Sequence, residues 1–124
     1  MAEREFLWTV TDPRGLSVSL AADAWAHIIE RHSQMSPYFD AVRLTVADPD
    51  EIYFDAKSTD EKAEGVWVEA YYKRRVIVHE RGERILYVSV KFVPQIGGAQ
   101  GFVQTAVLTE RIQRRMVFTW RRSQ

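Results

Sequence analysis

Hydrophobic residues that alternate with polar ones constrain this chain most, because that pattern requires β-strands through much of its second half. In the clearest run, 84–93, every second residue from Leu86 to Phe92 is apolar, and the residues between them form a mixed, polar face. Three further runs have the β-branched and aromatic composition of strands, and they cover residues 51–55, 66–72 and 102–109. We therefore expect a sheet built from consecutive antiparallel strands.

Two short β-favouring runs open the chain, Phe6–Val10 and Leu16–Leu20. Between them, Pro13 is followed two residues later by Gly15, which is a turn composition, so the sequence predicts a β-hairpin. The same segment, residues 1–20, could equally be an extension attached loosely to the rest of the domain.

Two helices are predicted after the hairpin. The first covers about 22–32, where apolar residues recur at helical spacing from Trp25 to His32. The second begins with Ser36 as its N-cap and Pro37 in the first helical position. It ends at Asp48, because a residue that precedes a proline is disfavoured in helical geometry.

Composition restricts the class of protein. The 124 residues suit a single domain, 1–124, and no apolar run approaches the roughly 20 residues that a membrane-spanning helix needs, so no membrane partner is expected. The acidic start of the chain is unlike a secretory signal. The chain has no cysteine, which excludes disulfides and thiolate chemistry and agrees with a cytoplasmic location.

Charge is distributed unevenly, although the net charge is zero. Residues 65–124 hold eleven basic and four acidic residues, and this half could meet phosphates. A solvated surface with a basic C-terminal segment, 110–124, would give the same counts. That segment suits a helix in its first part and a strand over 117–120. The basic residues of interest are Lys73, Arg74, Arg75, Arg111, Arg114, Arg115, Arg121 and Arg122.

Three side chains could cleave a phosphodiester if they converge. His32 continues the apolar stripe of the first helix, whereas Lys91 and Thr105 lie in two successive strands. In one register of that strand pair, Lys91 and Thr105 share a face with Tyr87. Each has a plainer interpretation: His32 caps a helix end, Lys91 extends from the solvent face of a sheet, and Thr105 reflects β propensity.

Other catalytic classes lack their motifs. His27 and His32 are five residues apart, which differs from the i, i+4 pair that binds zinc on a helix, and no cysteine is available to complete a ligand set. The stretch 96–98 has two glycines but not the lysine of a phosphate-binding loop, and no serine stands in a glycine-flanked elbow. No metal and no other cofactor is therefore expected.

The order of four segments resembles the phage and bacterial nucleases of the Barnase–EndoU–colicin–RelE superfamily. The segments are WAHIIERH (25–32), VADPDEI (46–52), VSVK (88–91) and GFVQTAVLT (101–109). The resemblance spans about residues 20–112. It implies an α+β fold, in which two N-terminal helices pack on an antiparallel sheet of about four strands, here preceded by the short β-hairpin.

This resemblance implies metal-independent cleavage of RNA, often in toxin or phage-conflict settings. The catalytic positions of the family match His32, Lys91 and Thr105. In the expected reaction a ribose 2′-hydroxyl attacks the adjacent phosphate, with His32 as acid or base, Lys91 stabilising charge and Thr105 holding a phosphate oxygen. Further contacts to the RNA are expected from Arg31, Tyr72, Lys73, Arg74, Arg75 and Tyr87.

Two departures from the family pattern favour an alternative function. Ser33 and Gln34 stand where the family often has proline and glutamate, and Val107 stands where tyrosine is usual. A catalytically inactive relative that binds RNA or a partner protein fits these departures. A structural or oligomeric domain is a third hypothesis, since four tryptophans and five tyrosines would also serve an interface. A toxin would in addition have a cognate inhibitor protein, over the basic face or over the acidic stretch 55–64.

Overall fold

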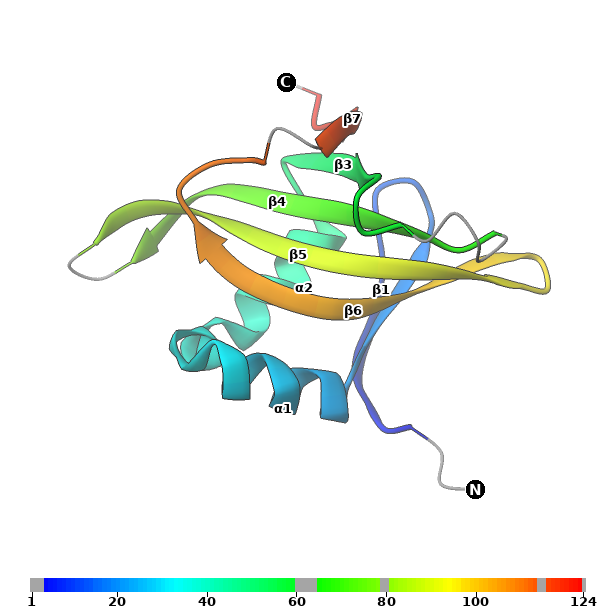
Figure 1. Ribbon diagram of the computed structural model, residues 1–124, viewed down its shortest axis with the longest axis horizontal. Helices are drawn as coiled ribbons and strands as arrows, with labels where there is room; N and C mark the ends of the chain where they lie inside the picture. The colour runs from blue at the N-terminus through cyan, green and yellow to red at the C-terminus, as the bar shows by residue number, and fades with distance from the viewer. Residues whose placement is uncertain (1–3, 60–64, 79–80, 114–115, 124) are drawn as a thin grey trace.

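The computed structural model describes residues 4–59, 65–78, 81–113 and 116–123, so that Arg114 and Arg115 lie outside the described residues. These residues form one sheet with the strand order β1-β2-β6-β5-β4-β3-β7, and the helices pack against it (Figure 1). The strands are β1 (Phe6–Thr11), β2 (Ser17–Ala21), β3 (Glu51–Asp55), β4 (Trp67–Val78), β5 (Gly82–Gln95), β6 (Gly98–Thr109) and β7 (Met116–Arg121). The helices are α1 (Ala22–Arg31), the 3-10 helix η1 (Ser33–Tyr38) and α2 (Phe39–Ala47).

The predicted fold class is wrong. The chain does not form two N-terminal helices on an antiparallel sheet of about four strands, because the sheet has seven strands and β2 pairs with β6 in parallel. The β1–β2 hairpin precedes both α-helices and belongs to that sheet. The run 116–121, which the sequence left open between helix and strand, forms β7 against β3.

The predicted positions of the helices agree better with the structure. α1 ends at Arg31, one residue before the expected end. Regular α2 starts at Phe39 rather than at Ser36, because Ser36 and Pro37 belong to the 3-10 helix η1. None of the described helices is long and apolar enough to span a membrane.

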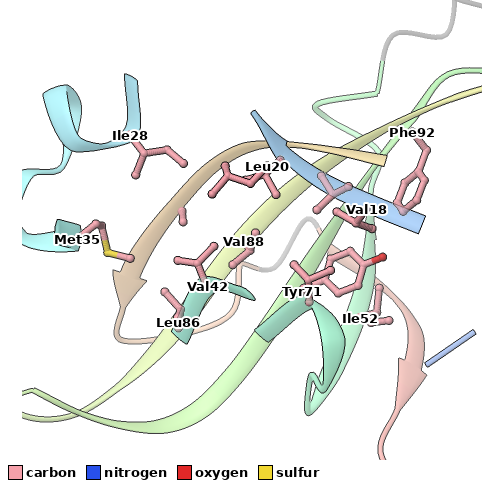
Figure 2. Packing of buried hydrophobic residues seen from close by; sticks show 14 residues of the cluster. Val18, Leu20, Ile28, Met35, Val42, Ile52, Tyr71, Leu86, Val88 and Phe92 are labelled. Carbon is pink, nitrogen blue, oxygen red and sulfur yellow. The ribbon is translucent and has the colours of Figure 1, made fainter. Parts of the chain in front are cut away.

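One apolar core lies between the helices and one face of the sheet. Val42 of α2 lies beside Leu86 and Val88 of β5, whereas Ile28 of α1 points toward Leu20 of β2, and all five side chains are fully buried (Figure 2). Each such side chain contributes about 1.5–3 kcal/mol relative to full exposure. The meander β4–β5–β6, whose strands are the longest, provides most of the surface that the helices cover.

The opposite face of the sheet, which we call the far face, carries Tyr72, Tyr87, Ser89, Lys91 and Thr105. One part of it is covered by the segment 110–113, which follows β6 on the way to β7. Ile112 of that segment packs with a second, smaller apolar cluster on this face. The cluster contains Tyr53, Ala70, Tyr72, Ile85, Tyr87 and Met116.

Candidate functional site

The three predicted catalytic residues do not come together. Lys91 lies between Val90 and Phe92, which are buried in the core under the helices, so strand alternation places Lys91 on the far face. Thr105 lies on the same face, because it pairs with Ser89 across β5 and β6. The expected shared face is therefore present, but the register shifts between Ser89 and Val90, so that Lys91 lies opposite Phe102 and the alternation along β6 is interrupted.

His32 lies on the other side of the sheet from Lys91 and Thr105. It follows α1 directly, and its backbone N–H donates to the carbonyl of Ile28 at 2.7 Å, which closes the last turn of the helix. Since α1 packs on the core face, the sheet separates the His32 imidazole from Lys91. A cleft of about 280 Å3 beside η1 does not include any of the three, and it is lined by Gln34, Tyr38, Val78, Arg81, Arg84 and Leu108.

Five of the six predicted RNA contacts are gathered at one end of the β4–β5 pair. Tyr72, Lys73, Arg74 and Arg75 are consecutive on β4, and Tyr87 of β5 lies directly opposite Tyr72. The ring centroids of the two tyrosines are 5.4 Å apart. They line a cavity of about 100 Å3 together with Val107, Thr109, Arg111 and Gln113.

Two of the six are not presented as expected. Tyr72 is 1% exposed, so its ring is not available as a stacking surface for a base. Arg31 is exposed at the end of α1, in the helical layer, and it does not line the cavity beside Tyr72 and Tyr87. The structure therefore brings the β4 residues and Tyr87 together and places Arg31 in the helical layer, apart from them.

A larger cleft, of about 590 Å3, lies where β4 passes the ends of β3 and β7. Four guanidinium groups and two carboxylates surround it, so the cleft has an excess of positive charge. We call it the arginine cleft. Its lining residues are Asp50, Glu51, Arg74, Arg75, Arg121 and Arg122.

Glu51 holds one of the four arginines. Its carboxylate is buried and accepts hydrogen bonds from the Arg74 guanidinium and, at 2.5 Å, from the Tyr53 hydroxyl. The hydrogen bond from Arg74 outweighs burial and lowers the pKa of Glu51. Burial and the bond to Glu51 raise the pKa of Tyr53. Glu51 is thus ionised near neutral pH, and its carboxylate is already hydrogen-bonded to Arg74 and Tyr53, which makes it a poor general base.

Asp48 and Asp50 form ion pairs with Arg122 of the cleft and with the neighbouring Lys73. Arg122 donates to the carboxylates of Asp48 and Asp50, and the hydrogen bond to Asp48 raises the pKa of Arg122. The Lys73 ammonium lies 3.8 Å from both of these carboxylates and donates to the backbone carbonyl of Asp48 at 2.9 Å. Lys73 and Arg122 are therefore largely neutralised from within the chain.

The remaining two arginines of the cleft form no hydrogen bond or ion pair with a carboxylate among the described residues, although the charge of Arg121 adds to the hydrogen bond from Arg74 in lowering the pKa of Glu51. Arg75 is exposed, and its side chain forms no ion pair or hydrogen bond there. The Arg121 guanidinium lies 5.3 Å from the ring centroid of Phe118, which is itself 53% exposed. The cleft therefore has two guanidinium groups that are not hydrogen-bonded to a carboxylate, and the exposed ring of Phe118 lies beside one of them, an arrangement suited to an anion that carries an aromatic group.

A second charged cluster lies on the core face of the sheet and has a structural character. The Arg14 guanidinium donates two hydrogen bonds to Glu69, at 2.8 and 2.9 Å, and two to Asp12, at 2.8 and 3.1 Å. The Tyr71 hydroxyl donates to Asp12 at 2.7 Å. Burial opposes the charge of Arg14, but the bonds to Glu69 and Asp12 outweigh it and raise the pKa of Arg14. These bonds tie the β1–β2 turn to β4.

No group of three His, Asp or Glu side chains in the described part of the chain is arranged to hold a metal ion. Comparison with protein-family models, curated proteins and solved structures gave no match. The resemblance to the nuclease superfamily therefore rests on the four sequence segments alone.

Sequence reasoning missed Phe118 and the pairing of Glu51 with Arg74. Alternation would have placed Phe118 and Arg121 on the far face only if 116–121 had been predicted as a strand with its bulge. The Glu51–Arg74 pair depends on the register of β3 against β4, in which Glu51 lies opposite Tyr72. Neither register can be read from residue types when both strands are short or irregular.

Proposed function

We propose that this protein binds single-stranded RNA, with the phosphate backbone in the arginine cleft. The observation that carries the proposal is the pair Arg75 and Arg121, two cleft arginines whose guanidinium groups form no hydrogen bond or ion pair with a carboxylate among the described residues. Guanidinium groups bind phosphate oxygens through paired hydrogen bonds, and they lose less hydration than ammonium groups when they do so. A phosphate is therefore the natural partner of the two arginines.

Phe118 supports a single strand rather than a duplex. Its ring is half exposed and lies beside Arg121, so an unstacked base could lie on the ring while the adjacent phosphate contacts the guanidinium. Bases inside a duplex are already stacked and paired. We choose RNA over DNA because the superfamily that the sequence resembles acts on RNA.

Binding can be tested by fluorescence anisotropy with a labelled 12-nucleotide RNA of mixed sequence. We expect Arg121→Ala to weaken binding about tenfold at 0.1 M salt, and to lower the salt slope by about 0.7, the value for one lost contact to a single strand. Lys57→Ala is the matched control, since it removes the same charge from an exposed turn that does not line the cleft. Equal affinities for wild type, Arg121→Ala and Lys57→Ala would contradict the proposal.

Cleavage of the bound RNA stays a prediction from the resemblance. General acid–base catalysis needs its groups within hydrogen-bond reach of one phosphate, and His32 lies across the sheet from Lys91 and Thr105. We therefore propose binding as the primary activity. Incubation of the RNA with purified protein in excess chelator, beside His32→Ala and Lys91→Ala, tests cleavage: a 2′,3′-cyclic phosphate product that disappears in both variants would establish the predicted ribonuclease.

A cytoplasmic location and a cognate inhibitor protein also stay predictions. Residues 60–64 of the acidic stretch proposed for the inhibitor lie outside the described residues. Expression of the protein alone tests the toxin hypothesis, because poor colony recovery on induction would support it and normal growth would count against it.

A further inference from the structure

The backbone of β4 is irregular where its arginines lie. Lys73 pairs with Leu86 and Val76 pairs with Arg84, so Arg74 and Arg75 together stand opposite the single residue Ile85. This is a β-bulge, and Arg75 takes a φ of 59° within it. A non-glycine residue in the left-handed region is disfavoured, and Arg75 is the one such residue within the described ranges.

The bulge places Arg75 between two clefts. On one side is the arginine cleft with Arg121 and Arg122. On the other side lies a cleft of about 300 Å3, and Arg74 and Arg75 line both. The residues that complete this second cleft are Glu83, Arg84, Ile85 and Glu110.

The second cleft continues the row of guanidinium groups onto β5. Arg84 is 3.9 Å from Glu110, whose side chain is 82% exposed, so water screens this pair strongly. Guanidinium groups thus follow one another from Arg121 on β7, through Arg75 on β4, to Arg84 on β5. A single phosphate would meet only part of this row.

We propose that the bulge makes Arg75 the bridge between the two clefts, and that the ligand is an extended strand whose consecutive phosphates occupy both. This inference rests on the proposed function and names the form of RNA that the site takes. A mononucleotide reaches one cleft, whereas a longer strand gains the second contact at high effective concentration. The strained backbone at Arg75 then has a function, since it directs one side chain to both clefts.

The test is a competition series, in which uridine oligonucleotides of two to twelve residues displace the labelled 12-nucleotide RNA. Arg84→Ala should weaken the 12-mer about tenfold and leave the dinucleotide within about twofold, because only the longer strand reaches the second cleft. Arg75→Ala and Arg75→Gly should both weaken the dinucleotide and the 12-mer.

The two substitutions at Arg75 also separate binding from strain. Both remove the guanidinium, but only glycine accepts a φ of 59° without cost, so Arg75→Gly should have a higher Tm than Arg75→Ala. An equal Tm for the two variants would overturn the assignment of strain to this position.

The remaining outcomes distinguish the two proposals. If wild type binds no RNA, the proposed function and this inference both fail. If RNA binding depends on Arg121 and Arg75 but Arg84→Ala binds the 12-mer as wild type does, the proposed function stands and the two-cleft path is wrong. Affinity that does not rise between two and twelve nucleotides would also overturn the path.

Discussion

Replacing Arg14 by methionine tests how the β1–β2 hairpin is held on the sheet. Methionine is apolar and similar in length to arginine, so the change mainly removes the positive charge. The network that loses this charge is buried, since the Asp12 side chain is fully buried and that of Glu69 is 4% exposed. Two buried carboxylates would then face each other and Tyr71 without a positive charge. Breaking a buried ion pair by removing one partner costs about 3–5 kcal/mol.

The expected loss lies at the lower end of that range. The Arg14 side chain is 23% exposed, so water can partly replace it, and we expect the free energy of unfolding to fall by about 3 kcal/mol. For a chain of this length, that corresponds to a fall in Tm of about 10 °C. It would remove a large share of the about 5–15 kcal/mol that stabilises a typical domain.

Urea unfolding at pH 7, followed by circular dichroism and by tryptophan fluorescence, measures this loss. Arg4→Met is the matched control, because Arg4 and Asp23 form an ion pair whose side chains are 48% and 74% exposed, and such pairs contribute about 0–1 kcal/mol. If Arg14→Met and Arg4→Met unfold at the same urea concentration, the Arg14 network does not hold the hairpin and the reasoning is refuted.

Three further predictions concern the cleft, the core and the far face. Glu51→Gln should reduce the loss of stability at acid pH. The pKa of Glu51 is lowered in the folded state, so the ionised side chain contributes to the free energy of unfolding above the unfolded-state pKa of about 4.3. This contribution is lost as the pH falls through the folded-state pKa. Urea midpoints between pH 2 and pH 7 would show whether wild type loses more stability than the variant. Gly101→Ala should destabilise by about 2 kcal/mol, because its Cβ would lie 2.7 Å from the Phe92 ring and 2.8 Å from Val90, and an unchanged Tm would argue against this packing. Lys91→Ala should leave RNA affinity within about twofold, since Lys91 lies outside both clefts, and a tenfold loss by anisotropy would move the site along the far face.

The elements that the sequence predicted have a clear local signal, which is periodicity in the long ones and β-branched or aromatic composition in the short strands β1, β2 and β3. The alternation in 84–93 predicted β5, and the spacing from Trp25 to His32 predicted α1 to within one residue. The face shared by Lys91, Tyr87 and Thr105 was expected from alternation on two long neighbouring strands, but the register shift between Ser89 and Val90 was not.

The sheet order could not be predicted for physical reasons. Parallel pairing of β2 with β6 involves three residue pairs that begin at Ser17 and Gln100, and no local pattern marks a contact between segments so far apart. The sequence left β7 open between helix and strand, because Ile112, Arg115 and Met116 suit a helix whereas 117–120 suits a strand, so that two periodicities compete in the same stretch.

The relative positions of the candidate catalytic residues could not be predicted for the same reason. Convergence of His32 with Lys91 requires knowing which face of the sheet α1 covers, and residue spacing within each segment does not contain that information. The basic run Lys73, Arg74 and Arg75, by contrast, could be read directly from the sequence. The arginines of β7 that complete the arginine cleft lie in a stretch that the sequence left open between helix and strand.

Ultraviolet cross-linking tests the central claim most directly, because it reports where RNA lies on the folded protein. Wild-type protein bound to an RNA that carries 4-thiouridine would be irradiated and digested, and the cross-linked peptide identified by mass spectrometry. We predict a cross-link at Phe118 that weakens in Arg75→Ala and in Arg121→Ala. A cross-link at Trp25 or Tyr38, in the helical layer beside His32, would contradict the account and would place the RNA on the other side of the sheet.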